Sequence, residues 1–335
     1  MRFLDRTLER FGLVAQSPSW PPRRLSLALQ GGGSFGAFTW GALERLLDEP
    51  EISFDAISGV SAGAVNAVLL ASGQMEGGRE AAKARLERFW KRMSRAAALT
   101  PSAAFANLPF GLMVRALSPY LFNPFNLNPL RQALIDEVDF ARLRTRSPVK
   151  LLIGATRVRD GALRVFSTSE IGVDVVLASA CLPLIHHTIE IDGEPYWDGG
   201  YAANPPLIPL VLASKAAQVL IVQVTPTSSE RLPTTPRDIA KRLEQIQFNA
   251  TLSAELEAIK YGMFVGATPK LRRLRIGRIS AQEEFVGLAD ESAGNLGWEF
   301  LERLRASGRG AVKAWLDETP RAPGRAAAPP GIAPE

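Results

Sequence analysis

The feature that most constrains this chain is the pentapeptide Gly59-Val60-Ser61-Ala62-Gly63, which stands between a short apolar segment and a run of small residues. A serine framed by two glycines at a strand-to-helix turn is typical of a nucleophile elbow, which exposes the hydroxyl at the carboxyl edge of a sheet. Residues 54–58 supply the predicted strand and residues 62–72 the predicted helix. The pattern therefore predicts alternating strands and helices, with Ser61 as the candidate nucleophile and Gly59 and Gly63 as the elbow glycines.

The chain has no histidine downstream to activate this serine. A serine hydroxyl is a poor nucleophile at neutral pH and needs a base within hydrogen-bonding reach. His186 and His187 are the only histidines, and they precede the turn Asp198-Gly199-Gly200, so the common order of serine, acid and histidine is not available. We expect the histidines to line a pocket wall or the surface and Asp198 to be the base. Because a free aspartate has a pKa of about 4, this assignment predicts a desolvated site that raises it.

A glycine run, Gly31-Gly32-Gly33-Ser34-Phe35-Gly36, follows the predicted strand at residues 25–29 and allows two interpretations. Gly31, Gly33 and Gly36 match a dinucleotide-binding fingerprint, with Asp55 as the ribose-binding acid, which would make the protein a nucleotide-binding oxidoreductase that retains NAD. Alternatively, backbone amides of Gly31, Gly32, Gly33, Ser34 and Gly36 form an oxyanion hole at a helix N-terminus. The serine elbow directly after the second strand favours the oxyanion hole.

Composition limits the chemistry and the partners. The single cysteine, Cys181, excludes an intrachain disulfide and leaves no cysteine cluster for zinc, which indicates a reducing, cytoplasmic compartment. We expect neither a metal nor an organic cofactor. The net charge of +5 favours anionic surfaces, but the basic residues are scattered and no nucleic-acid motif accompanies them. A lipid partner, with peripheral membrane association, is therefore favoured over nucleic acid.

The chain has enough apolar residues for one large core, since 46% of its 335 residues are hydrophobic. No apolar run reaches the roughly 18 to 20 residues that span a bilayer. We predict a segment 1–23, which is either an amphipathic helix on a membrane or a helix packed on its own domain, and a core at 24–224. A mainly helical extension at 225–318 and a disordered tail at 319–335 follow.

Three motifs in order give the chain a family resemblance. They are residues 27–36 with the glycine run, residues 57–64 with the elbow, and residues 178–200, which end in Tyr196-Trp197-Asp198-Gly199-Gly200. Over residues 24–224 the chain resembles patatin-like phospholipases. The resemblance implies a three-layer α/β/α fold with a mostly parallel central sheet, Ser61 as nucleophile and Asp198 as base. It also implies an oxyanion hole around residues 32–34. The chain departs from many members at Ser34-Phe35, where they carry a basic residue.

The function implied is a serine lipid acyl hydrolase of the phospholipase A type, acting through an acyl-enzyme on a phospholipid or another acyl-ester lipid. Other carboxylester or thioester hydrolases and transacylases share these motifs, because fold does not determine substrate. A non-catalytic lipid-binding protein is the alternative from another class, although both Ser61 and Asp198 are present. Residues 105–125, rich in aromatic and apolar side chains, are either a lid or membrane-docking surface or a packed loop.

Overall fold

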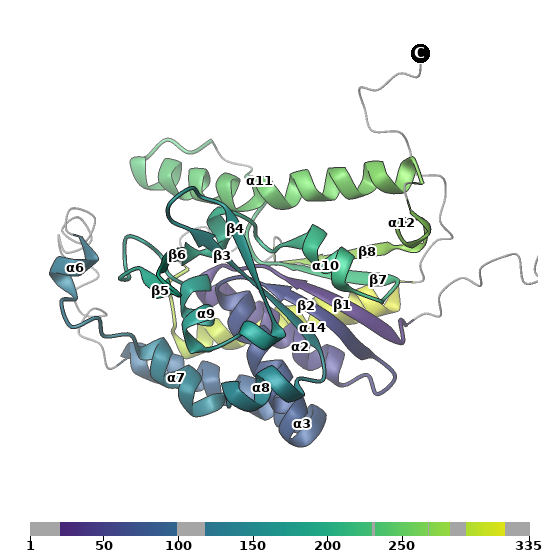
Figure 1. The fold of residues 1–335 in the computed structure, drawn as a ribbon, viewed down its shortest axis with the longest axis horizontal. Coiled ribbons are helices and arrows are strands. Elements are labelled where there is room, and N and C mark those ends of the chain that lie inside the picture. The colour runs from purple at the N-terminus through teal and green to yellow at the C-terminus, as the bar shows by residue number, and fades with distance from the viewer. Residues whose placement is uncertain (1–20, 99–117, 230–231, 267, 282–292, 319–335) are drawn as a thin grey trace, which may run out of the picture.

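The computed structural model describes residues 21–98, 118–229, 232–266, 268–281 and 293–318 (Figure 1). Most of the predicted N-terminal segment 1–23, most of the segment 105–125 and the predicted tail 319–335 lie outside these residues. Within the described part of the chain, no helix is both long enough and apolar enough to cross a membrane.

A mostly parallel sheet forms the centre of the fold. Its strands are β1 (Arg24–Leu29), β2 (Ser53–Gly59), β3 (Lys150–Arg157), β4 (Leu163–Ser167), β5 (Ile189–Ile191), β6 (Glu194–Asp198), β7 (Gln218–Gln223) and β8 (Arg275–Ser280). They are arranged in the order β5-β6-β3-β2-β1-β7-β8, and β4 pairs with β3 off this path. The neighbouring strands in the order β3-β2-β1-β7-β8 are parallel, whereas β4, β5 and β6 are antiparallel additions. The predicted mostly parallel sheet is confirmed.

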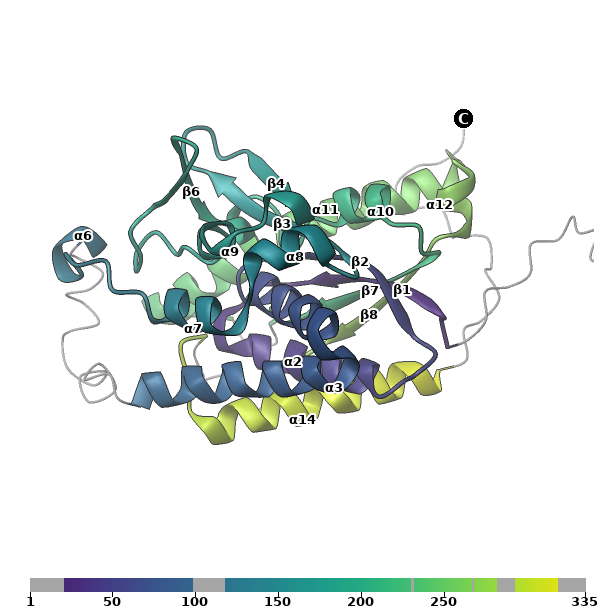
Figure 2. The ribbon, with the colours of Figure 1, turned by 60° about the horizontal axis from the view of Figure 1, so that its bottom comes forward.

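Helices cover both faces of this sheet (Figure 2). The helices are α2 (Gly36–Leu47), α3 (Ala62–Ala98), α6 (Pro119–Phe122), α7 (Pro129–Glu137), α8 (Phe140–Arg146), α9 (Val173–Ser179), α10 (Leu207–Ala213), α11 (Pro236–Phe264), α12 (Pro269–Arg273) and α14 (Trp298–Asp317), with the 3-10 turns η1 (Gly33–Phe35), η2 (Thr168–Glu170) and η3 (Gly199–Tyr201). One face carries α2, α3 and α14, and the other carries α10, α11 and α12.

The central strand β1 shows why the layers form. Successive side chains of a strand point to opposite faces. Leu25, Leu27 and Leu29 belong to the core under α2, α3 and α14, while Ala28 belongs to the second core under α10 and α11. Burial on both faces explains why β1 reads as a nearly continuous apolar run. The three-layer α/β/α architecture is confirmed.

Several elements differ from their predicted form. The helix predicted at 62–72 is the first part of α3, which continues to Ala98 after a kink at Gly77 and Gly78, both with non-helical backbone angles. Before β8, a short helix capped by the hydroxyl of Thr268 occupies 269–273. Four short helices, α6, α8, α9 and α10, were not predicted.

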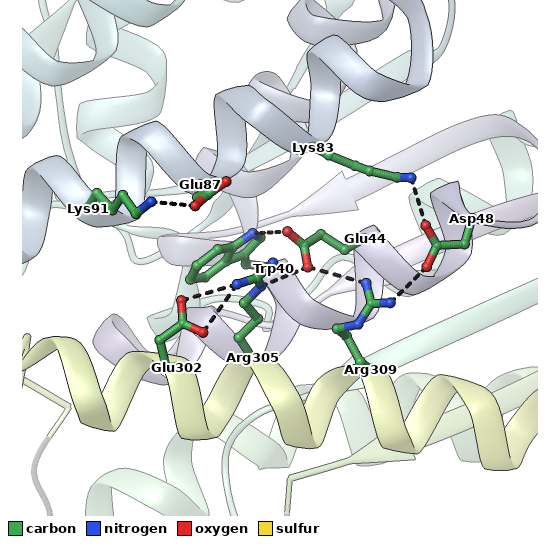
Figure 3. A network of polar contacts seen from close by, with 9 residues as sticks. All are labelled: Trp40, Glu44, Asp48, Lys83, Glu87, Lys91, Glu302, Arg305 and Arg309. Atoms are coloured by element: carbon green, nitrogen blue, oxygen red, sulfur yellow. Dashed lines mark hydrogen bonds and ion pairs between the residues drawn. The ribbon is translucent and has the colours of Figure 1, made fainter.

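The C-terminal segment contributes to two layers of the same fold. β8 extends the sheet beside β7, and α14 packs along α2. The two helices approach closely at glycines: a Cβ on Gly41 would lie 1.9 Å from the carbonyl oxygen of Arg305, and one on Gly308 would lie 2.0 Å from that of Phe38. Beside this contact, Glu44 on α2 binds arginines of α14 (Figure 3). The limits of the domains stay a prediction.

Candidate active site

Ser61 lies in the turn between β2 and α3 with a left-handed backbone, φ 51°. Residues with side chains rarely adopt this conformation, so the surrounding structure has to hold it. The amide of Ser61 donates to both the carbonyl and the hydroxyl oxygen of Ser179, each at 3.0 Å. A Cβ on Gly63 would lie 2.2 Å from the carbonyl oxygen of Leu29, and one on Gly59 would lie 2.7 Å from the backbone of Gly63. The turn therefore has the tight geometry of a nucleophile elbow.

Asp198 is the last residue of β6, beside β3. It is 2% exposed, and its Oδ1 accepts a 2.7 Å hydrogen bond from the amide of Gly200. The hydroxyl of Thr156 donates to the Asp198 carbonyl at 2.7 Å. A Cβ on Gly199 would lie 2.3 Å from the carbonyl oxygen of Gly154, so the turn packs against β3 only because this residue is glycine.

The structure brings the serine and the aspartate together, although they come from different strands of the sheet. The backbone amides of both residues donate to one short segment, at the carbonyls of Ser179 and Cys181. Burial raises the pKa of Asp198 to about 7, against the opposing effect of the Gly200 amide and the Ser61 side chain, and the charge of Glu244 raises it further. The predicted upward shift is confirmed. A carboxyl group that titrates near neutrality is a better proton acceptor than a free aspartate.

The glycine run lies directly against the serine. A Cβ on Gly31 would lie 2.7 Å from the Cβ of Ser61, and one on Gly36 would lie 2.6 Å from the Cβ of Ala62. Gly33 is in the left-handed region, with φ 59°. Side chains at positions 31 and 36 would push the run away from the elbow, so glycine is required there for the close approach.

Most amides of the run already have acceptors. The amide of Gly31 donates to Oδ1 of Asn204 at 2.7 Å, and that of Ser34 to the carbonyl of Ala293 at 2.8 Å. The amide of Gly36 closes the η1 turn. Within the described part of the chain, the amides of Gly32 and Gly33 have no acceptor. These two amides are therefore available to a ligand.

Asp55, the ribose-binding candidate of the nucleotide interpretation, has a different place in the fold. It lies near the start of β2, is 6% exposed, and is paired with Arg24. Its carboxylate also accepts from the hydroxyl of Ser214 and the amides of Lys215 and Ala216. The carboxylate thus anchors the segment before β7 at the amino ends of the strands, whereas ligands of such sheets bind at the carboxyl ends. The described residues contain no group of three or more His, Cys, Asp or Glu placed to hold a metal ion.

The two histidines lie in the loop before β5, and one of them connects this loop to α6. Nδ1 of His186 accepts from the amide of Leu182 at 3.2 Å, and burial lowers the pKa of His186. Nε2 of His187 lies 3.2 Å from the carbonyl oxygen of Pro119, and its ring lies 4.3 Å from that of Tyr120. These contacts support a role in shaping the rim of the site.

A group of buried carboxamide side chains under the glycine run was missed by the sequence analysis. Gln30, Asn204, Gln223 and Asn249 are each no more than 7% exposed, and they are linked by hydrogen bonds. We call them the carboxamide network. Two of them carried a signal, because Gln30 and Gln223 end apolar strands, where a buried polar side chain needs a partner. Their partners come from distant parts of the chain and could not be read from the sequence.

The chain is similar to a known family and to several solved structures. A family model described as patatin-like phospholipase matches residues 27–211. Among solved structures, VipD from Legionella pneumophila is similar with a TM-score of 0.45 and 16% identity, over 88% of this chain and 67% of that chain. The heterodimeric ExoU–SpcU complex from the type III secretion system of Pseudomonas aeruginosa is similar with a TM-score of 0.37 and 21% identity, over 71% of this chain and 52% of that chain. The chain thus spans about two thirds and about half of these two relatives. No curated protein sequence matches it.

Proposed function

Because the chain belongs to the patatin-like phospholipase family, a family of lipid acyl hydrolases, we propose that it cleaves a carboxylic ester of a phospholipid or related lipid with Ser61 and Asp198 as a catalytic dyad. The observation that carries the proposal is the buried carboxyl of Asp198, whose pKa burial raises to about 7 and on which the side chain of the elbow serine acts. Such a carboxylate is ionised in much of the enzyme at neutral pH and is still basic enough to take the serine proton.

The reaction proceeds in two steps. Asp198 accepts the proton of Ser61 as Oγ attacks the ester carbonyl carbon, and it returns that proton to the leaving alcohol or lysolipid. The acyl group is then bonded to Ser61. Water gives a proton to Asp198 and attacks the acyl carbonyl carbon, and Asp198 passes that proton to Oγ of Ser61 as the bond to the fatty acid breaks.

The oxyanion hole narrows in this proposal to the amides of Gly32 and Gly33. The amides of Gly31 and Ser34 already donate within the chain. Gly31 and Gly36 instead serve to bring the run close to the elbow, where a Cβ would collide. Each fixed donor stabilises the developing negative charge by about 3 kcal/mol.

We propose that the lipid enters from a bilayer across an uncharged surface beside the site. This surface consists of residues 118–128 and 181–188, which contain no Asp, Glu, Lys or Arg. The Tyr120 hydroxyl joins the two segments by accepting from the amide of Thr188. The second segment begins beside the site, because the carbonyl of Cys181 accepts from the amide of Asp198. Exposed apolar side chains on it are Tyr120, Leu121, Phe125, Leu127, Leu184 and Ile185.

The catalytic proposal is tested by labelling with a fluorophosphonate probe, which reacts with an activated serine. We expect labelling of the wild type and of Ser253→Ala, an exposed serine on α11 that serves as the matched control. Folded Ser61→Ala and Asp198→Ala are expected to stay unlabelled. Labelling that survives Ser61→Ala contradicts the proposed nucleophile, and a folded wild type that stays unlabelled with and without vesicles indicates a non-catalytic lipid-binding protein.

Substrate class is tested by hydrolysis of phospholipid vesicles, a soluble short-chain ester and an acyl thioester by the same preparation. A preference for vesicles supports the phospholipase assignment. A preference for the thioester, or acyl transfer to an added alcohol in place of water, identifies one of the alternative acyl-transfer enzymes on this fold.

A further inference from the structure

The turn that follows Asp198 reaches across to the glycine run through one side chain. Asn204 is 1% exposed, and its carboxamide contacts both polar groups of Gly31. Oδ1 accepts from the Gly31 amide at 2.7 Å, and Nδ2 donates to the Gly31 carbonyl at 3.3 Å. An asparagine carboxamide has both a donor and an acceptor, so the Asn204 side chain holds the amide and the carbonyl of Gly31 at the same time.

The bond to the carbonyl controls the next amide. The Gly31 carbonyl and the Gly32 amide belong to one planar peptide unit, in which the C=O and N–H bonds of the trans form point in opposite directions. Holding the carbonyl toward Asn204 therefore directs the Gly32 amide away from the buried network. The hydroxyl of Thr225 donates to the same carbonyl at 3.4 Å and supports this orientation.

Asn204 is held in turn by the rest of the carboxamide network. Nε2 of Gln30 donates to the Asn204 carbonyl at 3.4 Å and to Oδ1 of Asn249 at 3.0 Å. Oε1 of Gln30 accepts from the amides of Val224 and Thr225, at 2.8 Å and 2.7 Å. The network thus joins the ends of β1 and β7, the turn after the aspartate and α11, without a formal charge on any of its four side chains.

We propose that Asn204 is a positioning residue that sets the amides of the oxyanion hole relative to Ser61 and couples them to the turn that carries Asp198. This inference rests on the function proposed above. It assigns to Asn204 an effect on the transition state, in which the negative charge exists, and no effect on the binding of the uncharged ester.

The test compares Asn204→Ala and Asn204→Asp with the wild type on a soluble p-nitrophenyl ester. We expect kcat of Asn204→Ala to fall about 100-fold with KM within about twofold, since loss of one oxyanion donor costs about this much. Asn204→Asp keeps an acceptor for Gly31, loses the donor and adds a negative charge. We expect it to lose at least as much kcat and to shift the midpoint of the pH profile upward, while Asn204→Ala leaves the midpoint unchanged.

Gln218→Met is the matched control, because Gln218 is a buried carboxamide at the opposite end of β7 and its Nε2 has no partner within the described part of the chain. It is expected to keep kcat and the pH midpoint. Rates are expressed per serine that the fluorophosphonate labels, so that partial misfolding does not lower kcat.

Four outcomes overturn the inference: an unchanged kcat in folded Asn204→Ala, an equal loss in Gln218→Met, a loss confined to KM, or recovery of both Asn204 variants only as unfolded protein, which would make the role structural. Failure of the proposed function is distinguished by the wild type itself, since it would then hydrolyse the ester no faster than Ser61→Ala.

Discussion

Two polar networks in this molecule are built from opposite kinds of side chain. The first, which we call the ion-pair network, links α2, α3 and α14 through charged groups (Figure 3). Glu44 accepts from Arg305 at 2.8 Å and from Arg309 at 3.4 Å, and Asp48 joins Arg309 to Lys83 at 2.9 Å and 2.7 Å. The second is the carboxamide network under the glycine run, whose four side chains are neutral.

The difference reflects what lies beside each network. The carboxamide network supports the residues around Asp198, whose pKa burial already raises to about 7. A nearby formal charge would shift this pKa again and act on the negative charge of the transition state. Carboxamides provide donors and acceptors without that field. The ion-pair network lies between helices, and none of its members belongs to the proposed dyad or oxyanion hole.

Placing a charge in the carboxamide network is expected to have the largest effect on stability. In Gln30→Glu one oxygen still accepts from Val224 and Thr225, but the other faces Oδ1 of Asn249 in place of the Nε2 donor. Burial would raise the pKa of the new carboxyl, so its folded state holds a proton more tightly than its unfolded state. Stability is then lost as pH rises. We expect a loss of about 3 to 5 kcal/mol at pH 8 that shrinks toward pH 5.

Urea unfolding at the two pH values checks this prediction. Gln247→Glu, at an exposed position of the same helix as Asn249, is the control and should change stability little at either pH. A Gln30→Glu protein with the same loss at both pH values would contradict the argument from charge and leave only a steric explanation.

Removing the charge of Asp198, next to the carboxamide network, should change stability in the opposite direction. Burial raises the pKa of Asp198 in the folded protein to about 7, well above the value of about 4 for a free aspartate. Its contribution to stability is fully present below the unfolded pKa and is lost as pH rises through about 7. Asp198→Asn has no such loss. We therefore expect it to be more stable than the wild type by on the order of 3 kcal/mol at pH 8, with little difference near pH 4.

Chemical denaturation across this pH range measures the effect, with the exposed turn variant Asp192→Asn as the control. If Asp198→Asn and the wild type were equally stable at both ends of the range, the ionised aspartate would cost nothing in the fold.

The same carboxyl leads to a prediction for the pH profile of the reaction. We expect kcat of the wild type to rise with pH through an apparent pKa near 7, because only the carboxylate accepts the serine proton.

The sequence predicted those parts of the site that depend on neighbours in the chain. The elbow and the glycine run are local motifs, and Leu25, Leu27 and Leu29 alternate as a strand between two layers requires. It also singled out Asp198 as the candidate base, because the turn at Asp198 repeats a known motif, and that role stays a proposal. Each of these features is complete within a few residues.

The missed features depend on partners far along the chain or on weak local signals. Asn204 contacts Gly31, and Asn249 contacts Gln30, although long stretches of the sequence separate the two partners of each pair. The helices α9 and α10 are seven residues each, and an apolar run of that length fits a strand equally well. Missing α9 also hid Ser179, which holds the elbow amide.

In the ion-pair network, loss of the central carboxylate is expected to have an intermediate effect. The Glu44 side chain is 4% exposed and also accepts from Nε1 of Trp40 at 2.9 Å. Glu44→Gln keeps that acceptor but leaves two arginines without their buried counter-charge. Since both arginines are partly exposed, we expect a loss of about 2 kcal/mol, measured by urea unfolding, with kcat unchanged. Glu302→Gln, at a more exposed partner of Arg305, should cost much less; an equal cost would show that burial of Glu44 is not the cause.

The smallest effect is expected at the edge of the ion-pair network. Hydrogen bonds to Asp48 and Glu80 raise the pKa of Lys83, and, although burial opposes it, bonds from Lys83 and Arg309 hold the pKa of Asp48 below its usual value. Lys83→Met should cost only about 0.5 kcal/mol near pH 7, since such partly exposed pairs are screened and Arg309 still pairs with Asp48. A carboxyl with a lowered pKa loses its contribution as pH falls, so the difference from the wild type should shrink in acid. If Lys83→Met cost nearly as much as Gln30→Glu, the contrast between the two networks would be wrong. The ion-pair network would then tolerate a lost charge no better than the carboxamide network tolerates an added one.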